Sequence, residues 1–212
     1  MAKRYHDDGK TLIERYAFID VYNTDNTTRK VLGFTIDWEK LYKYLKGKWN
    51  CQKVYFFAGI EPGDMEKEQE YDRLKGIGYE MRTKRTMVYK VKDRTVELTC
   101  MKCHLKQPKI IDMGYTRKSN CDVELTMEVM LRAKPKVDLM ILTGDGDFTK
   151  LIEYAQAQGS TIKVVAYTRR GEPTHQKRLS TILKSTFQIP GVNYVDINSW
   201  KDKVKIDAST VI

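Results

Sequence analysis

An unbroken apolar run that ends in a glycine-hinged acidic turn is the feature that most restricts how this chain can fold. The run is Leu139-Met140-Ile141-Leu142, and the turn Thr143-Gly144-Asp145-Gly146-Asp147-Phe148 follows directly. A continuous apolar run is typical of a strand buried on both faces in a parallel sheet. Ligands of open α/β sheets bind where the carboxyl ends of such strands meet the next loops. We therefore expect Asp145 and Asp147 to lie at a binding edge, although a capped helix start gives the same pattern.

Two more aspartates occupy comparable positions elsewhere in the chain. Asp20 ends the apolar segment Ala17-Phe18-Ile19, and Asp122 opens a predicted helix. Two like charges about 4 Å apart repel by roughly 4 kcal/mol at an effective dielectric near 20, so a cluster of these acids must hold protons or a cation. Each acid also has a plain structural interpretation, Asp20 as a turn former and Asp122 as a favourable charge at a helix N-terminus. If the strands are neighbours, the four aspartates predict a divalent metal site.

Strands and helices alternate along most of the chain. The predicted strands are one ending at Asp20 and those at 53–58, 138–143, 161–167 and 193–197, and the predicted helices span 38–45, 65–75, 122–133, 149–158 and 175–185. This alternation predicts a mainly parallel sheet covered by helices on both faces, a three-layer α/β/α sandwich. The polar stretch 24–30 is predicted to be a turn. On the helix at 122–133, one apolar face is predicted from Val123, Met127, Met130 and Leu131.

Positive charge is concentrated in the middle of the sequence. The 212 residues carry a net charge of +10, and 82–118 contains eleven lysines and arginines against three acids, about +8 in total. The alternating segments 87–92 and 95–99 predict a basic β-hairpin that turns at Asp93-Arg94 and inserts at about 86–106. Lysine and arginine contacts to phosphate give sequence-independent affinity for nucleic acid, while a solvated surface is the alternative. The candidate nucleic-acid-binding residues are Arg82, Lys84, Arg85, Lys90, Lys92, Arg117 and Lys118.

The cysteines give a weaker signal. Cys100-Met101-Lys102-Cys103-His104 has the spacing of half a zinc site or of a haem attachment. A four-ligand zinc site needs a second ligand pair, and Cys51 and Cys121 stand alone and far apart. Structural or incidental thiols are the favoured interpretation, and the role of Cys100, Cys103 and His104 stays open.

Taken together, the motifs resemble a known family. They are Asp20-x-x-Asn23 after the first strand, Lys118-x-x-x-Asp122 at a helix start, and the Thr143–Phe148 turn after a later strand. This set and its order are similar to those of the NYN domain family of PIN-like ribonucleases, including its LabA-like branch. The resemblance covers roughly 17–200. Val21 stands where family members often carry glycine, and the long basic hairpin region is a second departure.

The resemblance implies an Mg²⁺- or Mn²⁺-dependent ribonuclease with a PIN-like fold. Carried over by position, Asp20, Asp122, Asp145 and Asp147 are the implied catalytic and metal-binding acids. Asn23, Thr143 and Lys118 are implied supports, although each can equally be a turn, backbone-capping or solvent-facing residue. Independently of the family, no histidine lies in any of these motifs, which favours a metal-activated water over histidine acid–base catalysis.

The remaining expectations concern domains, location and alternatives. We expect a lead-in at 1–15, one nuclease domain at 16–200 and a tail at 201–212. No apolar stretch approaches the roughly 20 residues needed to cross a bilayer, and the start lacks a secretory signal, so we expect a cytoplasmic protein acting on RNA, single-stranded by preference. The oligomeric state, including a homo-oligomer, stays open. The alternatives are a non-catalytic RNA-binding or scaffold module and a phosphatase of the haloacid-dehalogenase type.

Overall fold

The protein is built on a six-stranded parallel sheet with strand order β10-β9-β8-β1-β2-β3. The computed structural model describes residues 13–99, 101–118, 120–168 and 179–207, with backbone alone at 117 and 118. The strands of this sheet are β1 (Glu14–Asp20), β2 (Lys53–Ile60), β3 (Glu80–Arg85), β8 (Val137–Leu142), β9 (Thr161–Ala166) and β10 (Val192–Asp196). The chain builds β1, β2 and β3 outward, then returns to place β8 beside β1. This doubly wound order reverses between β1 and β8.

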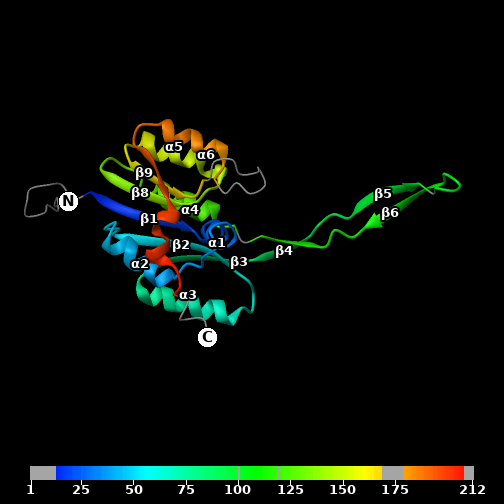
Figure 1. Ribbon diagram of the computed structural model, residues 1–212, viewed down its shortest axis with the longest axis horizontal. Coiled ribbons are helices and arrows are strands. Elements are labelled where there is room, and N and C mark those ends of the chain that lie inside the picture. Colours follow the sequence, from blue (N-terminus) through cyan, green and yellow to red (C-terminus); the bar gives the residue numbers. More distant parts are fainter. Residues whose placement is uncertain (1–12, 100, 119, 169–178, 208–212) are drawn as a thin grey trace, which may run out of the picture.

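Helices cover both faces of the sheet, which confirms the predicted three-layer α/β/α sandwich (Figure 1). One face packs against α1 (Val21–Lys30), α2 (Trp38–Gly47), α3 (Met65–Ile77) and α7 (Lys201–Val204). The other packs against α4 (Asp122–Met130), α5 (Thr149–Ala157) and α6 (Thr181–Ser185). Short 3₁₀ turns lie at Gly146–Phe148, Thr186–Gln188 and Ile197–Trp200. None of the helices in the described ranges has the length and apolar character needed to cross a bilayer.

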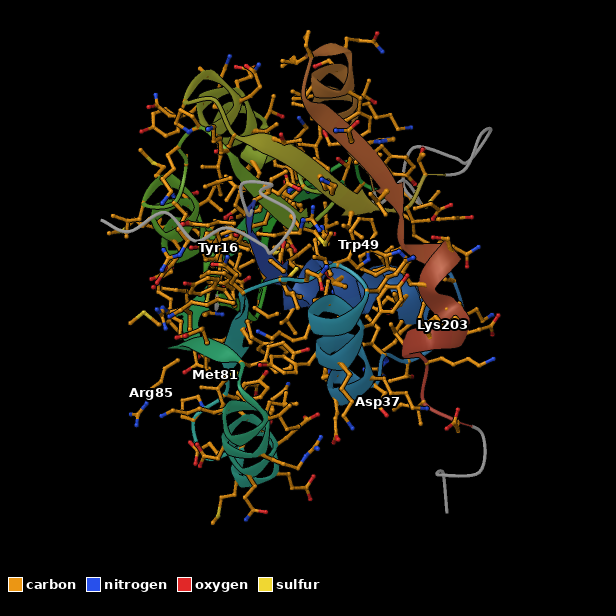
Figure 2. The ribbon with its side chains drawn as sticks, turned by 90° about the vertical axis from the view of Figure 1, so that its left-hand side faces the viewer. Tyr16, Asp37, Trp49, Met81, Arg85 and Lys203 are labelled. Carbon is orange, nitrogen blue, oxygen red and sulfur yellow. The ribbon has the colours of Figure 1, made fainter. Side chains whose placement is uncertain are left out.

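Alternate side chains of each strand fill the two layers. In β1, Ala17 and Ile19 join the core under α2, while Phe18 joins the core under α4 and α5. All six residues of β8 are buried, as the continuous apolar run predicts for a strand covered on both faces. Figure 2 shows side chains filling the space between sheet and helices, whereas Arg85 points away from the body.

The stretch at 24–30 is helical, so the predicted turn is wrong. Asp20 caps the helix α1, since its carboxylate accepts a hydrogen bond from the Asn23 N–H. Buried threonines on α1 satisfy their hydroxyls on backbone carbonyls: Thr24 donates to Leu142 at 3.1 Å and Thr27 to Asn23 at 2.8 Å. A helix that is polar in sequence therefore packs on the sheet without leaving its hydroxyls unpaired.

The basic hairpin exists, but its predicted pairing is wrong. Segment β4 (Met87–Lys90) pairs with β7 (Tyr115–Lys118), and β5 (Arg94–Thr99) pairs with β6 (Lys106–Ile111), both antiparallel. The two predicted strands thus lie one after the other on the outgoing branch, and the chain turns back between Thr99 and Lys106. The insertion is longer than expected and forms a narrow two-stranded ribbon that projects from the body (Figure 1).

Two further predictions differ from the structure. Val123, Met127, Met130 and Leu131, which were predicted to form the apolar face of the helix at 122–133, are exposed, whereas Leu125 and Val129 of α4 face the core. The first four residues of the predicted tail form α7, which packs Val204 into the core beside α2. Residues 1–12 of the lead-in predicted at 1–15 and residues 175–178 of the helix predicted at 175–185 lie outside the described residues, as do Cys100 and Ser119. The described part of that predicted helix includes α6.

Candidate active site

The predicted acids lie at the reversal of strand order, between the carboxyl ends of β1 and β8. Ile19 pairs with Leu142 in the parallel register, so Asp20 and Thr143 leave the sheet side by side. The Thr143 hydroxyl donates to the Asp20 carboxylate at 3.0 Å. In open α/β sheets this reversal opens a crevice outside the strand ends, where ligands bind.

Asn23 joins the two loops at this edge. Its side-chain oxygen accepts the Gly144 N–H at 2.9 Å, while its own N–H donates to Asp20 at 3.1 Å. Asn23 and Thr143 therefore both hold the turn after β8 against the start of α1. This arrangement gives both residues a concrete positioning role.

The turn itself is held by its own polar groups. The Asp145 N–H donates to the Thr143 hydroxyl at 3.2 Å, and the Asp147 N–H donates to the Asp145 carboxylate at 3.1 Å. Gly146 lies between them under the start of α6, where an added Cβ would come within 2.4 Å of Ser180 Oγ. The Ser180 N–H also donates to the Gly144 carbonyl at 2.9 Å. The glycine is required by this close approach, and its backbone needs no positive φ.

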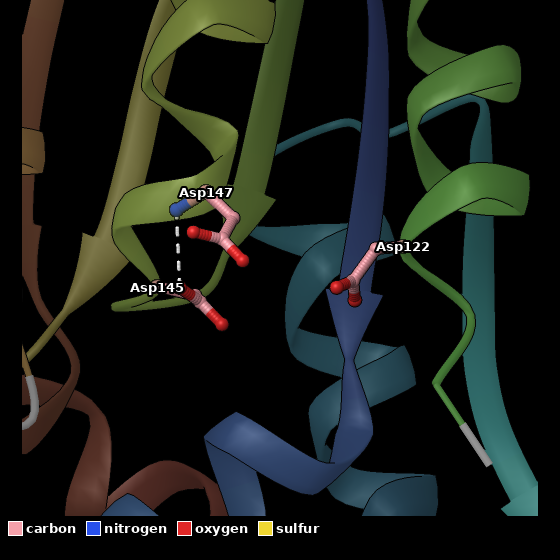
Figure 3. Close-up of side chains that lie close together, drawn as sticks. All are labelled: Asp122, Asp145 and Asp147. Atoms are coloured by element: carbon pink, nitrogen blue, oxygen red, sulfur yellow. Dashed lines mark hydrogen bonds between the residues drawn. The ribbon is translucent and has the colours of Figure 1, made fainter. Parts of the chain in front are cut away.

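Asp122 reaches the same place from the N-terminus of α4. Asn120 fixes its start, because the Asn120 side chain accepts the Asp122 N–H at 2.7 Å and its amide donates to the Asp122 carboxylate at 2.5 Å. One carboxylate oxygen from each of Asp122, Asp145 and Asp147 lies within 4.8 Å of the other two (Figure 3). The sequence reading missed Asn120, although Asn two residues before Asp is a recognisable local capping pattern.

Asp20 lies beside this trio, and the negative charges of Asp122 and Asp145 affect its pKa. Burial raises the pKa of Asp20 from 3.8 to about 6, with further increases from Asp122 and Asp145, against the lowering by its bonds from Asn23 and Thr143. Burial also raises the pKa of Asp122, helped by the charges of Asp145 and Asp147. Such shifts are the expected result of gathering carboxylates at a partly buried site. Both oxygens of Asp20 already accept hydrogen bonds, and Asp20 is not one of the three closest groups.

The donor set fits a hard divalent cation. An ion that sits about 2.1 Å from each oxygen needs oxygens no more than about 4.2 Å apart. Because the three oxygens lie within 4.8 Å of one another, Asp122, Asp145 and Asp147 would need to close by at most about 0.6 Å to hold it. Three monodentate carboxylates leave other octahedral positions for water or a phosphate oxygen. Within the described part of the chain, this is the only group of three or more acidic, histidine or cysteine side chains with such spacing. Cys103 and His104 lie on the ribbon, and Cys103 is free and exposed.

The predicted nucleic-acid-binding residues divide into two groups. Arg82 pairs with Glu128 of α4 at 2.6 Å and Lys84 pairs with Glu124 at 3.0 Å, so both connect β3 to α4. Lys90 is held between Asp112 and Asp93 on the ribbon. Arg85 and Lys92 are exposed and make no ion pair with the described residues, and for Arg117 and Lys118 the structure gives the backbone course in β7.

The fold and the acid cluster define the class of protein as a PIN-like nuclease-type α/β/α domain. A model of the NYN domain matches residues 16–186, so the chain belongs to the NYN domain family. NYN domains are generally ribonucleases, and PIN-like nucleases usually use divalent metals. The family prediction made from the motifs is confirmed, and the LabA-like branch stays a prediction.

Solved structures support the fold alone. A protein of unknown function, VPA0982 from Vibrio parahaemolyticus, superimposes with a TM-score of 0.57 at 19% identity, covering 87% of this chain and 94% of that one. Phosphofructokinase-2 from Escherichia coli gives a TM-score of 0.35 at 12% identity, covering 73% of this chain and 54% of that one, which is too distant to support an argument. No curated protein sequence matches the chain.

Proposed function

We propose that this protein is an Mg²⁺- or Mn²⁺-dependent endoribonuclease that hydrolyses RNA phosphodiesters. The observation that carries the proposal is the convergence of Asp122, Asp145 and Asp147 at the reversal of strand order, beside the half-buried Asp20. These three acids come from two separate segments of the chain, and their negative charges repel one another. A bound cation would relieve this repulsion. The NYN membership supports the reaction class.

The residues divide the work in the proposed reaction. Asp122, Asp145 and Asp147 would hold the cation. Asp20 would add negative charge beside them, and its carboxylate accepts hydrogen bonds from the Thr143 hydroxyl and the Asn23 N–H. When bound by these carboxylates, a divalent ion would supply polarisation of a phosphoryl oxygen and a lowered pKa for a bound water. The hydrogen bonds from Asn23 and Thr143 set the positions of the carboxylates before substrate arrives, so little reorganisation is needed during reaction.

The structure also bears on the phosphatase alternative. A haloacid-dehalogenase-type enzyme would need Asp20 as a nucleophile with a free oxygen facing the substrate. Here one Asp20 oxygen accepts from the Asn23 N–H and the other from the Thr143 hydroxyl. This arrangement suits a positioning or metal-side carboxylate and supports the nuclease proposal.

A cleavage assay tests the proposal. Labelled single- and double-stranded RNA and DNA are incubated with Mg²⁺, Mn²⁺ or a chelator. We expect RNA cleavage only with metal, and Asp145→Asn should reduce its rate by at least about 100-fold because one of three metal ligands is lost. The matched control is Asp196→Asn, which changes an aspartate that caps the turn after β10, two strands from the site.

Metal binding is measured separately by thermal unfolding. Mg²⁺ or Mn²⁺ should raise the melting temperature of the wild type and of Asp196→Asn, and should do so much less for Asp145→Asn. Full RNA cleavage by a pure, folded Asp145→Asn protein would refute the site. RNA binding that survives chelation, with no cleavage under any metal, would instead support the non-catalytic module.

A further inference from the structure

The long ribbon formed by residues 87–118, which we call the arm, lacks a core of its own. It consists of two strand pairs in series, β4 with β7 near the body and β5 with β6 farther out (Figure 1). Every residue of β6 is exposed, and so are Leu98, Ile110 and Ile111. An isolated two-stranded ribbon is at best marginally stable in water. The length of the arm and its exposed apolar side chains indicate that a binding partner covers part of it when the protein functions.

The cross-strand register separates two kinds of charge on the outer half of the arm. Opposite residues share a face, so Arg94, Val96, Leu98 and Lys109 lie together on one side. Glu97 and Lys106 lie on the opposite face of the ribbon, where they form an ion pair at 3.4 Å. Arg94 and Lys109 form no ion pair with any described residue. One face, which we call the Arg94 face, therefore combines uncompensated positive charge with apolar side chains.

The net charge of the whole arm indicates which kind of partner could bind to this face. Residues 87–118 contain eight lysines and arginines against three acids. A second copy of the arm would bring two sets of like charges together, whereas a polyanion would neutralise them. Arginine and lysine contact phosphates, and apolar or aromatic side chains contact the faces of unpaired bases. Charge complementarity thus favours a nucleic-acid strand.

The arm also leads directly to the acid cluster. Its last strand, β7, ends at Lys118, and Asn120 and Asp122 follow within four residues. At about 3.3 Å a residue, the outgoing branch from Met87 to Thr99 reaches roughly 40 Å. With one phosphate about every 3.4 Å along a stacked strand, this length corresponds to about a dozen nucleotides.

We propose that the Arg94 face of the arm binds the backbone of the same RNA whose phosphodiester lies at the acid cluster. The proposal rests on the proposed ribonuclease function and names its substrate class, which is RNA long enough to occupy both the cluster and the arm. Short oligonucleotides reach only the cluster. The enzyme should therefore bind and cleave long RNA much more efficiently than short RNA.

The test compares two RNAs. One has about 25 nucleotides, more than the roughly dozen phosphates that the arm can span, and the other has about 5 nucleotides, fewer than the arm can span. The variant is Arg94→Gln/Lys109→Gln. The arm control, Glu97→Gln/Lys106→Gln, alters the opposite face. The charge-matched control, Lys48→Gln/Lys136→Gln, removes two positive charges that lie before β2 and β8, at the edge of the sheet away from the cluster. Binding is measured by fluorescence anisotropy with chelator, and cleavage with Mn²⁺.

Each lost phosphate contact lowers the single-strand salt slope by about 0.7, which is about fivefold in affinity at 0.1 M salt. For Arg94→Gln/Lys109→Gln we expect the Kd of the long RNA to rise roughly 25-fold and its salt slope to fall by about 1.4. The ratio of long-RNA to short-RNA cleavage should fall in parallel. Both controls should bind the long RNA within about twofold of wild type.

Three results would overturn the proposal. They are an unchanged Kd for the long RNA, an equal loss in the Lys48→Gln/Lys136→Gln control, and a wild-type dimer in analytical ultracentrifugation that only the Arg94 face variant dissociates. The last result would assign this face to a second copy of the chain. If no RNA is cleaved but the binding difference holds, the nuclease function fails and the arm contact stands. If cleavage is robust but independent of RNA length and of the Arg94 face, the arm proposal fails alone.

Discussion

Replacing Asp20 by asparagine should stabilise the metal-free protein at neutral and higher pH. Burial and the neighbouring carboxylates raise the pKa of Asp20 from 3.8 to about 6. The folded protein therefore binds more protons than the unfolded chain between these values, and stability falls as pH rises through that window. At about 1.36 kcal/mol for each unit of pKa, ionised Asp20 costs up to about 3 kcal/mol above pH 7. Asparagine removes this cost and still caps α1 through its one side-chain oxygen. It loses the acceptor that the second carboxylate oxygen offers to the Thr143 hydroxyl, which reduces the gain by about 1 kcal/mol at every pH.

Urea unfolding in chelator at several pH values measures the effect. The difference in free energy of unfolding between Asp20→Asn and wild type should grow as pH rises from about 4 to about 7 and then level off. Asp37→Asn, which changes the matching N-cap of α2, reports the effect of exchanging a capping carboxylate for an amide. Saturating Mg²⁺ should stabilise the wild type more than Asp20→Asn, because the cation favours the ionised carboxylate. A difference that does not change with pH would refute the reasoning.

Two further predictions concern the support of the site and of the sheet. Gly146→Ala should cost about 1–3 kcal/mol and reduce cleavage, because the new Cβ meets Ser180 at 2.4 Å; adding Ser180→Gly should restore much of both, as measured by thermal unfolding and RNA cleavage. Asp138→Asn should cost about 3 kcal/mol in urea unfolding, because the buried carboxylate pairs with Arg15 at 2.5 Å and Lys163 at 3.0 Å and its loss leaves two cations without a counter-charge. An unchanged midpoint in either experiment would contradict the stated role.

The elements whose signals are local could be predicted from the sequence. The apolar run of β8 predicted a strand buried on both faces, and all its residues are buried. Asp37 predicted the start of α2, where its carboxylate accepts the Lys40 N–H. These signals depend on residues a few positions apart, so they need no knowledge of the rest of the fold.

The failed predictions depend on partners distant in the chain. Helix α1 was missed because its threonines look turn-forming, and only the Leu142 carbonyl of β8 supplies Thr24 with a buried acceptor. On α4, a plausible apolar stripe through Met127 is exposed because Leu125 and Val129 are the residues that face the sheet. The pairing in the arm went wrong because alternation identifies a strand but does not identify its partner.

The sequence by itself determined which acids this protein offers, their order, the strand that ends at Asp20, the strand that precedes Asp145, and the family resemblance. Only the tertiary structure decided that Asp122, Asp145 and Asp147 meet, that Asp20 stands behind them, and that the basic insertion is an arm. The physical reason is that carboxylates separated by up to 127 positions approach one another only because β8 returns beside β1. Local residue patterns specify strands and caps, whereas the order of strands in the sheet specifies which of their ends become neighbours.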